Sequence, residues 1–185
     1  TSGEVLYQSK PIVKPQPGLT MVFQHFALMP WLTVLQNVEL GLEAKGVSRG
    51  ERRNRAIDAI DVVGLDGFES AYPKELSGGM SQRVGLARAL VVDPEVLLMD
   101  EPCSALDPLS SNVLEELIIR LKEKLTVVVV THNLAQAARI SERMAFFWCC
   151  KGAGCLMEEG ATKDLFTQPK TEVTRRYIQS ETMSC

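Results

Sequence analysis

The period of apolar and polar positions changes twice along the chain. Two short stretches near its beginning, Glu4–Tyr7 and Thr20–Phe23, predict strands on either side of a loop rich in proline and lysine. From Thr33 onward apolar residues recur every three or four positions, which predicts helices. Continuous apolar runs such as Val96–Met99 return later and predict buried strands. The pattern therefore places a helical region between two parts that contain strands.

Three helices are expected in the middle region. The first begins at Thr33. The second begins with the capping-box pattern of Ser48 and Glu51 and ends at Gly64. The third begins near Ser77. Its apolar side consists of Met80, Val84, Ala87 and Val91.

The later apolar runs predict the main sheet. Val96–Met99 and Val127–Val130 are separated by a helical stripe, and this alternation favours a parallel sheet covered on both faces. Ala145–Trp148 predicts a third strand, which can pair with Leu156–Glu159 as a hairpin. Residues 162–180 predict two short helices. The expected fold class is therefore α/β.

Composition narrows the class of protein. The length of 185 residues suits a single domain, and 45% hydrophobic with 23% charged residues excludes a disordered, collagen-like or coiled-coil chain. No apolar run approaches the ~18 residues of a membrane span, so we expect that the chain does not cross a bilayer by itself. The 20 basic and 23 acidic residues give a net charge of -3, which does not favour a nucleic-acid binder. Thr1–Glu4 shows no signal-peptide pattern.

The five cysteines do not form the even-numbered framework of a disulfide-rich protein. Cys149, Cys150 and Cys155 cluster in one short segment. A zinc site there needs a fourth ligand, and both histidines, His25 and His132, are distant in sequence. We interpret the cluster as reduced thiols in a glycine-containing hairpin turn.

Two carboxylates follow the strand Val96–Met99. Asp100 and Glu101 stand at the carboxyl end of a parallel strand, the edge at which such sheets bind ligands. One carboxylate there can hold a hydrated Mg²⁺, and the next can orient an attacking water. Solvated acidic residues are an equally simple interpretation of this segment alone.

Three further segments carry polar groups suited to a phosphate ligand. Ser77–Gly79 precedes a helix, so its amide groups lie at a positive helix end, although an ordinary serine cap is the alternative. His132 follows Val127–Val130 and can contact a terminal phosphate. Gln24 follows Thr20–Phe23 and can contact a metal ion or water. Each of these residues, taken alone, is more often structural.

The ordered set of segments is more specific than any one of them. Along the chain stand Gln24, LSGGM at 76–80, LLMDEP at 97–102, SALD at 104–107 and His132. Together they strongly resemble the nucleotide-binding subunit of an ATP-binding cassette (ABC) transporter over nearly the whole chain. The resemblance implies a RecA-like parallel-sheet core of the P-loop NTPase type, N-terminally truncated, with an inserted helical subdomain.

The resemblance also implies roles for individual residues, with ATP and Mg²⁺ as cofactors. The implied catalytic residues are Glu101, which polarises water, His132, which contacts the γ-phosphate, and Gln24. Asp100 and Gln24 belong to the shell of the Mg²⁺ ion. The implied nucleotide-binding residues are Ser77, Gly78, Gly79, Gln82 and Asp107, the first three of which bind the ATP held across a dimer.

A division of the chain follows from the same resemblance. Residues 1–185 form one ABC ATP-binding domain. Within it, 1–24 and 93–160 make up the RecA-like core, 25–92 the helical signature subdomain, and 161–185 a C-terminal helical tail.

The implied partners are integral membrane permease subunits and a second ATP-binding subunit, at the cytoplasmic face of the cell membrane. The transported substrate is contacted only through the permease, and nucleic acid is not an expected partner. The segment His25–Asn37 carries Phe26, Met29 and Trp31, whose exposure would create a partner surface. The alternative is that Phe26 and Trp31 pack into the helical subdomain.

Different segments of the chain resemble two different branches of ABC importers. FQHFALMP at 23–30, with LSGGM, resembles importers of glycine betaine, taurine or nitrate. MDEPCSALDP at 99–108 and the segment 131–147 resemble phosphate importers. The longer match favours phosphate or another small anion as the solute.

One motif of the family is not found. The Walker A loop, G-x-x-x-x-G-K-[ST], cradles phosphates and should precede Thr1; Gly41–Ser48 has the glycine spacing but a valine in place of the lysine. We therefore expect a chain that is truncated before residue 1, in the gene or only in this sequence, and that hydrolyses ATP poorly alone. A catalytically inactive remnant that binds a partner is the alternative function. A soluble ABC ATPase of DNA repair or chromosome organisation is set aside, because no long coiled coil separates Gln24 from Leu76.

Overall fold

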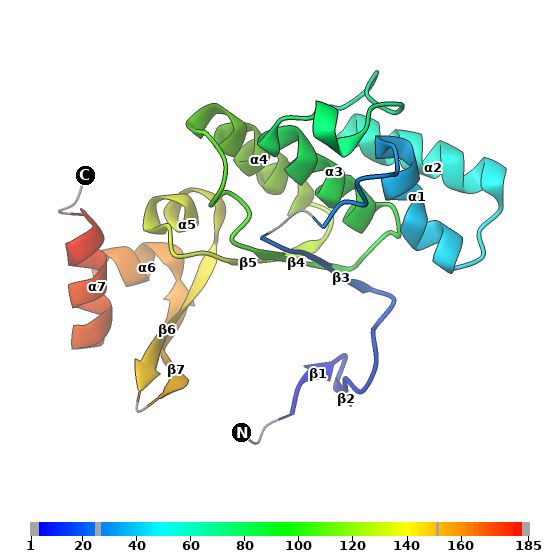
Figure 1. Cartoon of the computed structure of the whole chain (residues 1–185). Helices are drawn as coiled ribbons and strands as arrows, with labels where there is room; N and C mark the ends of the chain where they lie inside the picture. Colours follow the sequence, from blue (N-terminus) through cyan, green and yellow to red (C-terminus); the bar gives the residue numbers. More distant parts are fainter. Residues whose placement is uncertain (1–3, 25–26, 151, 183–185) are drawn as a thin grey trace. The chain divides into compact units, whose positions relative to one another are not determined.

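The computed structural model describes residues 4–24, 27–150 and 152–182. The chain divides into two compact units, Thr1–Val130 and Thr131–Cys185 (Figure 1). The first unit contains β1 (Leu6–Tyr7), β2 (Lys10–Pro11), β3 (Leu19–Val22), α1 (Val34–Ala44), α2 (Arg49–Val62), the 3-10 helix η1 (Pro73–Glu75), α3 (Gly78–Leu90), β4 (Val96–Asp100), α4 (Pro108–Leu121) and β5 (Thr126–Val130). The second contains α5 (Leu134–Ile140), β6 (Arg143–Cys150), β7 (Ala153–Ala161), α6 (Thr162–Thr167) and α7 (Glu172–Thr182).

A parallel sheet in the order β3-β4-β5 forms the base of the first unit. This sheet confirms the expected α/β fold class. Leu97 and Met99 are fully buried on the face that helices cover. The helices of this unit lie on one side of the sheet (Figure 1).

The other face of this sheet differs from the sequence prediction. Met21, Leu98 and Val128 lie in one row of the register, and Met21 and Val128 are 37% and 44% exposed. Val130 is 51% exposed. Coverage of both faces was expected, but within the described part of the first unit helices cover one face only. Side chains alternate between the faces of a strand, so a continuous apolar run shows that either face can be buried, not that both are.

Local capping explains where the helices begin. The predicted starts at Thr33, Ser48 and Ser77 are confirmed, since each of these residues is an N-cap whose side chain accepts a backbone N–H bond. The second helix ends at Val62, and the predicted stop, Gly64, follows its C-cap with a φ of 65°. The full capping box expected with Glu51 is only half formed: its N–H donates to Ser48 Oγ at 3.4 Å, and no return bond from its side chain is described.

The helices α1, α2 and α3 share an apolar core. Its fully buried side chains include Val38, Leu42, Ile60, Leu65, Val84 and Leu86. The strand expected over Glu4–Tyr7 is reduced to the two residues of β1, which pair antiparallel with β2. Tyr7 Oη donates to the Glu95 carboxylate at 2.6 Å and holds this small pair beside the start of β4.

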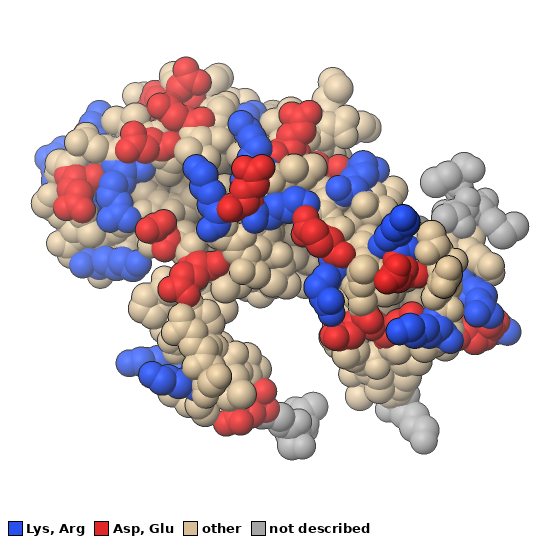
Figure 2. Space-filling model, turned by 180° about the vertical axis from the view of Figure 1, so that it is seen from behind, with Lys and Arg blue, Asp and Glu red and all other residues tan. Residues whose placement is uncertain are grey.

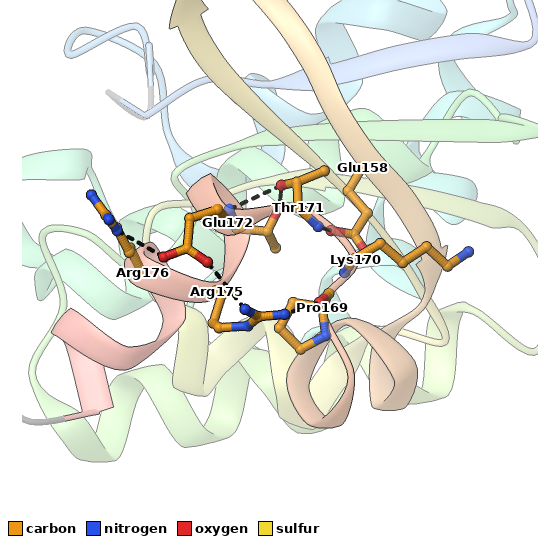
Figure 3. Close-up of polar contacts among 8 residues, drawn as sticks. Glu158, Pro169, Lys170, Thr171, Glu172, Arg175 and Arg176 are labelled. Atoms are coloured by element: carbon orange, nitrogen blue, oxygen red, sulfur yellow. Dashed lines mark hydrogen bonds and ion pairs between the residues drawn. The ribbon is translucent and has the colours of Figure 1, made fainter.

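The second unit is built on the hairpin of β6 and β7, which is separate from the parallel sheet and confirms the predicted pairing. The two helices expected in the tail are α6 and α7. Glu158 on β7 accepts from the backbone N–H groups of Lys170 at 2.9 Å and Thr171 at 3.2 Å (Figure 3). Burial opposes the charge of Glu158, but these two bonds and Thr174 lower its pKa. The carboxylate thus ties the start of α7 to the hairpin.

Candidate functional site

The carboxyl ends of β3 and β4 lie side by side, because the strands run parallel with Val22 opposite Met99. Gln24 closely follows β3, and Asp100 is the last residue of β4. The structure therefore brings Gln24, Asp100 and Glu101 to one edge of the sheet. This is the arrangement that the sequence predicted for a ligand-binding edge.

Hydrogen bonds connect the segments at this edge. Gln24 Nε2 donates to Ser104 Oγ at 3.4 Å, and Ser104 Oγ donates to the Glu101 carbonyl oxygen at 3.0 Å. The N–H of Glu101 donates to the carbonyl of Val130 at 2.8 Å. Sequence reasoning gave Ser104 no role of its own, since only the fold shows that it bridges two distant segments.

The backbone of Glu101 is in the left-handed region, with a φ of 45°. Few residues other than glycine adopt this conformation, and it costs on the order of 1–3 kcal/mol. Such strain is concentrated at functional sites. It supports a role for Glu101 beyond that of a solvated strand end.

The residues at the sheet edge fit a hydrated Mg²⁺. Asp100 is half-buried and supplies one carboxylate, and the exposed Gln24 supplies an amide. Mg²⁺ is usually held by one or two carboxylates together with water and substrate phosphates. An all-protein cage is not needed, and among the described residues no group of three His, Cys, Asp or Glu side chains is placed to hold a metal.

Ser77–Gly79 starts α3 as predicted. Ser77 Oγ accepts the N–H of Met80 at 3.2 Å, and Ser77 and Gly78 are exposed. Gly79 is buried, and a Cβ built on it would lie 2.5 Å from Ser110 Oγ and 2.7 Å from Ser110 Cβ. The close packing of α3 against α4 therefore requires a glycine at 79, whether or not a phosphate approaches it.

Asp107 is the N-cap of α4. Its Oδ1 accepts the N–H groups of Leu109 at 3.0 Å and Ser110 at 3.1 Å. The side-chain and backbone hydrogen bonds from Ser110 lower the pKa of this carboxyl. The carboxylate is thus engaged within its own chain, and the nucleotide contact expected of it stays a prediction.

Gln82, predicted to bind nucleotide, is buried in the structure. The side chain is 1% exposed, and neither of its amide atoms has a hydrogen-bond partner in the described part of the chain. It is buried because α3 packs against α1, α2, β3 and α4. Its contact with a nucleotide stays a prediction.

His132 belongs to the second unit, where it is exposed and precedes α5. Asn133 caps that helix by accepting the N–H of Gln136 at 2.9 Å. The structure shows that His132 is accessible. Its contact with a phosphate stays a prediction.

The segment expected to contact a partner is partly described, since His25 and Phe26 lie outside the described residues. Trp31 is 70% exposed and Met29 is 37% exposed, so the alternative that Trp31 packs into the helical subdomain is wrong. Beside this segment is a surface pocket of about 340 Å³. Its lining consists of Leu32, Gln36, Glu39, Leu40, Glu43, Arg49 and Arg52.

Asn37 fixes the loop that carries Trp31, and sequence reasoning missed it. It is fully buried; its Oδ1 accepts the N–H of Met29 at 2.8 Å, and its Nδ2 donates to the carbonyls of Met29, Leu32 and Thr33 at 3.2, 3.1 and 3.0 Å. In the sequence, the signal for this role was a polar residue that stands beside the apolar positions of the predicted helix.

The charges on the surface are mixed. Basic and acidic side chains are interspersed over the face shown in Figure 2. Among the described residues, none of the helices has both the length and the apolar content to cross a membrane.

Several proteins of known sequence are similar to this chain. The methionine import ATP-binding protein MetN of Staphylococcus saprophyticus is 40% identical over 191 residues, which cover 98% of this chain and 55% of that protein. The glycine betaine transport ATP-binding protein OpuAA of Bacillus subtilis is 41% identical over 168 residues, covering 90% and 39%. An uncharacterized ABC transporter ATP-binding protein, MJ0412 of Methanocaldococcus jannaschii, is 49% identical over 146 residues, covering 78% and 55%.

The chain spans about half the length of curated relatives such as the methionine import proteins. The model of the family described as ABC transporter matches residues 1–104. This match takes in Gln24, Ser77–Gly79, Asp100 and Glu101, the residues whose geometry is described above. The sheet edge with Gln24, Asp100 and Glu101 agrees with the family match, and the chain belongs to the ABC transporter family, with ATP-binding subunits as its relatives.

Proposed function

We propose that this protein is an ATP-binding subunit that energises an ABC importer through ATP hydrolysis. The observation that carries the proposal is the sheet edge at which Gln24, Asp100 and Glu101 lie together, with Gln24 and Glu101 joined through Ser104. Relatives named as ATP-binding proteins of methionine import and of glycine betaine transport support it.

The proposed chemistry assigns one task to each group. Asp100 and Gln24 would hold Mg²⁺, which offsets the charge of the ATP phosphates. Glu101 orients and polarises the attacking water, and His132 contacts the γ-phosphate. Ser77–Gly79 binds the ATP of a second subunit across a dimer, at a helix end that favours negative charge.

For Asp107 and Gln82 the structure shows a place at or within the helices. Asp107 caps α4, the helix that packs against Gly79 of the signature loop, Ser77–Gly79, and Gln82 is buried in α3, the helix that this loop starts. The helical region 25–92 carries this loop, 1–24 and 93–160 carry the nucleotide edge and His132, and 161–185 is a tail.

For the transported solute we propose only its class, a small molecule that passes through the permease. The relatives reported above are named for methionine or glycine betaine, not for phosphate. They therefore do not support the phosphate specificity expected from the C-terminal half. A small organic solute of the methionine or betaine kind is the better proposal.

The proposed partner is a membrane permease that docks at the cytoplasmic side. The exposed Trp31 and the neighbouring pocket lined by Leu32, Leu40 and Arg52 offer both apolar and charged groups to such a partner. Asn37 holds this loop in place from within. A peripheral subunit at the membrane is consistent with this surface.

The test is complementation between two chains. A related subunit that carries a Walker A loop, but whose own signature loop is disabled, is mixed with this 185-residue chain and its ATPase activity is measured. We expect the chain to restore activity, and a Ser77→Arg variant to fail. Ser48→Arg is the matched control, because Ser48 is also an exposed N-cap serine but lies in α2.

Two results would contradict the proposal. Activity that is not restored, or that Ser77→Arg restores equally, shows that the loop is only a helix cap. The second candidate function, a catalytically inactive partner-binding module, would then be favoured. The packing of Gly79 against Ser110 supports that candidate, because it explains the glycine without a ligand. The chain alone is expected to hydrolyse ATP slowly, since no lysine-containing phosphate loop occurs in the printed sequence.

A further inference from the structure

The tip of the hairpin β6–β7 brings together three sulfur atoms that the proposed function does not use. Cys150 lies opposite Ala153, and Cys155 lies opposite Trp148. Opposite residues, and residues two apart on one strand, share a face of the hairpin, so the two cysteines are diagonal neighbours on one face. Met157 reaches the same point, with its Sδ 3.8 Å from Cys150 Sγ.

The register of the hairpin places the thiols of Cys150 and Cys155 next to each other as diagonal neighbours on this face. Both cysteines are free and half-buried. Cys155 Sγ also lies 3.9 Å from the carbonyl oxygen of Ala153, so two thiols and a thioether share this place with one backbone oxygen.

We propose that Cys150, Cys155 and Met157 form a binding site for Cu(I). Thiolate and thioether sulfurs select this soft monovalent ion over harder cations. On binding, each thiol releases its proton to solvent, and the two thiolates and the neutral thioether each donate an electron pair to the ion. No oxidation or reduction takes place.

Zinc suits this cluster less well, because it prefers four nitrogen, sulfur or oxygen ligands and thioethers are not among them. The nearest carboxylates on the same strand are already engaged. Glu158 accepts from the N–H groups of Lys170 and Thr171, and Glu159 pairs with Arg143 at 3.5 Å. The described residues around the cluster therefore supply three sulfurs and the backbone oxygen of Ala153, which is not among the usual zinc ligands.

A disulfide also suits the cluster less well. Diagonal positions of a hairpin have Cα atoms about 7–8 Å apart, whereas a disulfide usually joins Cα atoms about 4.4–6.8 Å apart. A metal ion between Cys150 and Cys155 spans the longer separation without moving the strands. Cys149 lies on the opposite face and is exposed, so it provides a natural control.

The test is a titration of the reduced 185-residue chain with Cu(I), without oxygen and in competition with a chromophoric Cu(I) chelator. We expect one tightly bound Cu(I). Cys150→Ser and Cys155→Ser should each weaken it by at least about 100-fold and Met157→Leu by at least about tenfold, because loss of a direct ligand should cost no less than the roughly 10–100-fold that loss of an outer-shell partner costs. The matched control Cys149→Ser should leave the affinity within about twofold of wild type, because it removes no ligand.

X-ray absorption of the copper-loaded wild-type chain gives a second measurement that does not depend on the folding of a variant. Only sulfur neighbours are expected around the ion. Nitrogen or oxygen ligands would overturn the proposal. So would an equal loss with Cys149→Ser, tighter binding of Zn(II) than of Cu(I), or a chain that forms a Cys150–Cys155 disulfide and binds no copper when reduced.

Discussion

Replacing Gly79 by alanine tests whether packing or ligand access explains the glycine in the signature loop. A Cβ at this position would lie 2.5 Å from Ser110 Oγ and 2.7 Å from Ser110 Cβ. Real Cβ atoms do not approach other atoms so closely, so α3 or α4 must shift. At the neighbouring Gly78 the nearest atoms, from Ala105 and Leu106, are 3.9 Å away, which is an ordinary contact.

The magnitude follows from two opposing effects. Overpacking in a well-packed interior costs about 1–3 kcal/mol, whereas alanine improves on glycine in a helix by up to about 1 kcal/mol. Gly79→Ala should therefore lower the free energy of unfolding by about 1–2 kcal/mol. Gly78→Ala meets no close atom and should leave stability unchanged or raise it by up to about 1 kcal/mol.

Urea denaturation followed by circular dichroism measures both variants. A double-mutant cycle with Ser110→Gly removes the two atoms that Gly79→Ala would meet, so much of the cost of Gly79→Ala should disappear in that background, with a coupling of about 1–2 kcal/mol. Equal stabilities of Gly79→Ala and Gly78→Ala, or a coupling near zero, would refute the packing argument. The glycine would then have to be explained by access of a ligand.

Two further predictions concern polar groups that hold loops and helix ends. Asn37→Ala should lower the free energy of unfolding by about 2–4 kcal/mol, because it removes four hydrogen bonds and leaves backbone groups unsatisfied. The exposed Asn54→Ala should change it by less than about 0.5 kcal/mol in the same denaturation assay, and equal losses would contradict the buried role. The hydrogen bonds of Ser110 lower the pKa of Asp107 in the folded protein. Ionised Asp107 therefore contributes stability at pH values above the ordinary aspartate pKa of about 3.9. This contribution is lost as the pH falls through the lower pKa of the folded protein. The stability difference between wild type and Asp107→Asn should thus be constant near neutral pH and shrink in acid; a difference that stays constant through the acid range would contradict this.

Local sequence determined the helix starts and the places of the strands along the chain. A serine or threonine cap acts on N–H groups two or three residues away, so Ser48 and Ser77 could be identified without knowledge of the fold. The position of Asp100 and Glu101 at the end of a strand was likewise a local property. The ordered motifs indicated the family for the same reason, since each motif is a short stretch of chain.

Tertiary structure decided what depends on contacts between distant segments. Gln82 shares a short motif with Ser77, yet packing of α3 turned it into the interior. The need for glycine at 79 comes from Ser110, which lies on another helix. The uncovered face of the sheet was also invisible in the apolar strands, because a run of valines has the same sequence whether one of its faces or both are buried.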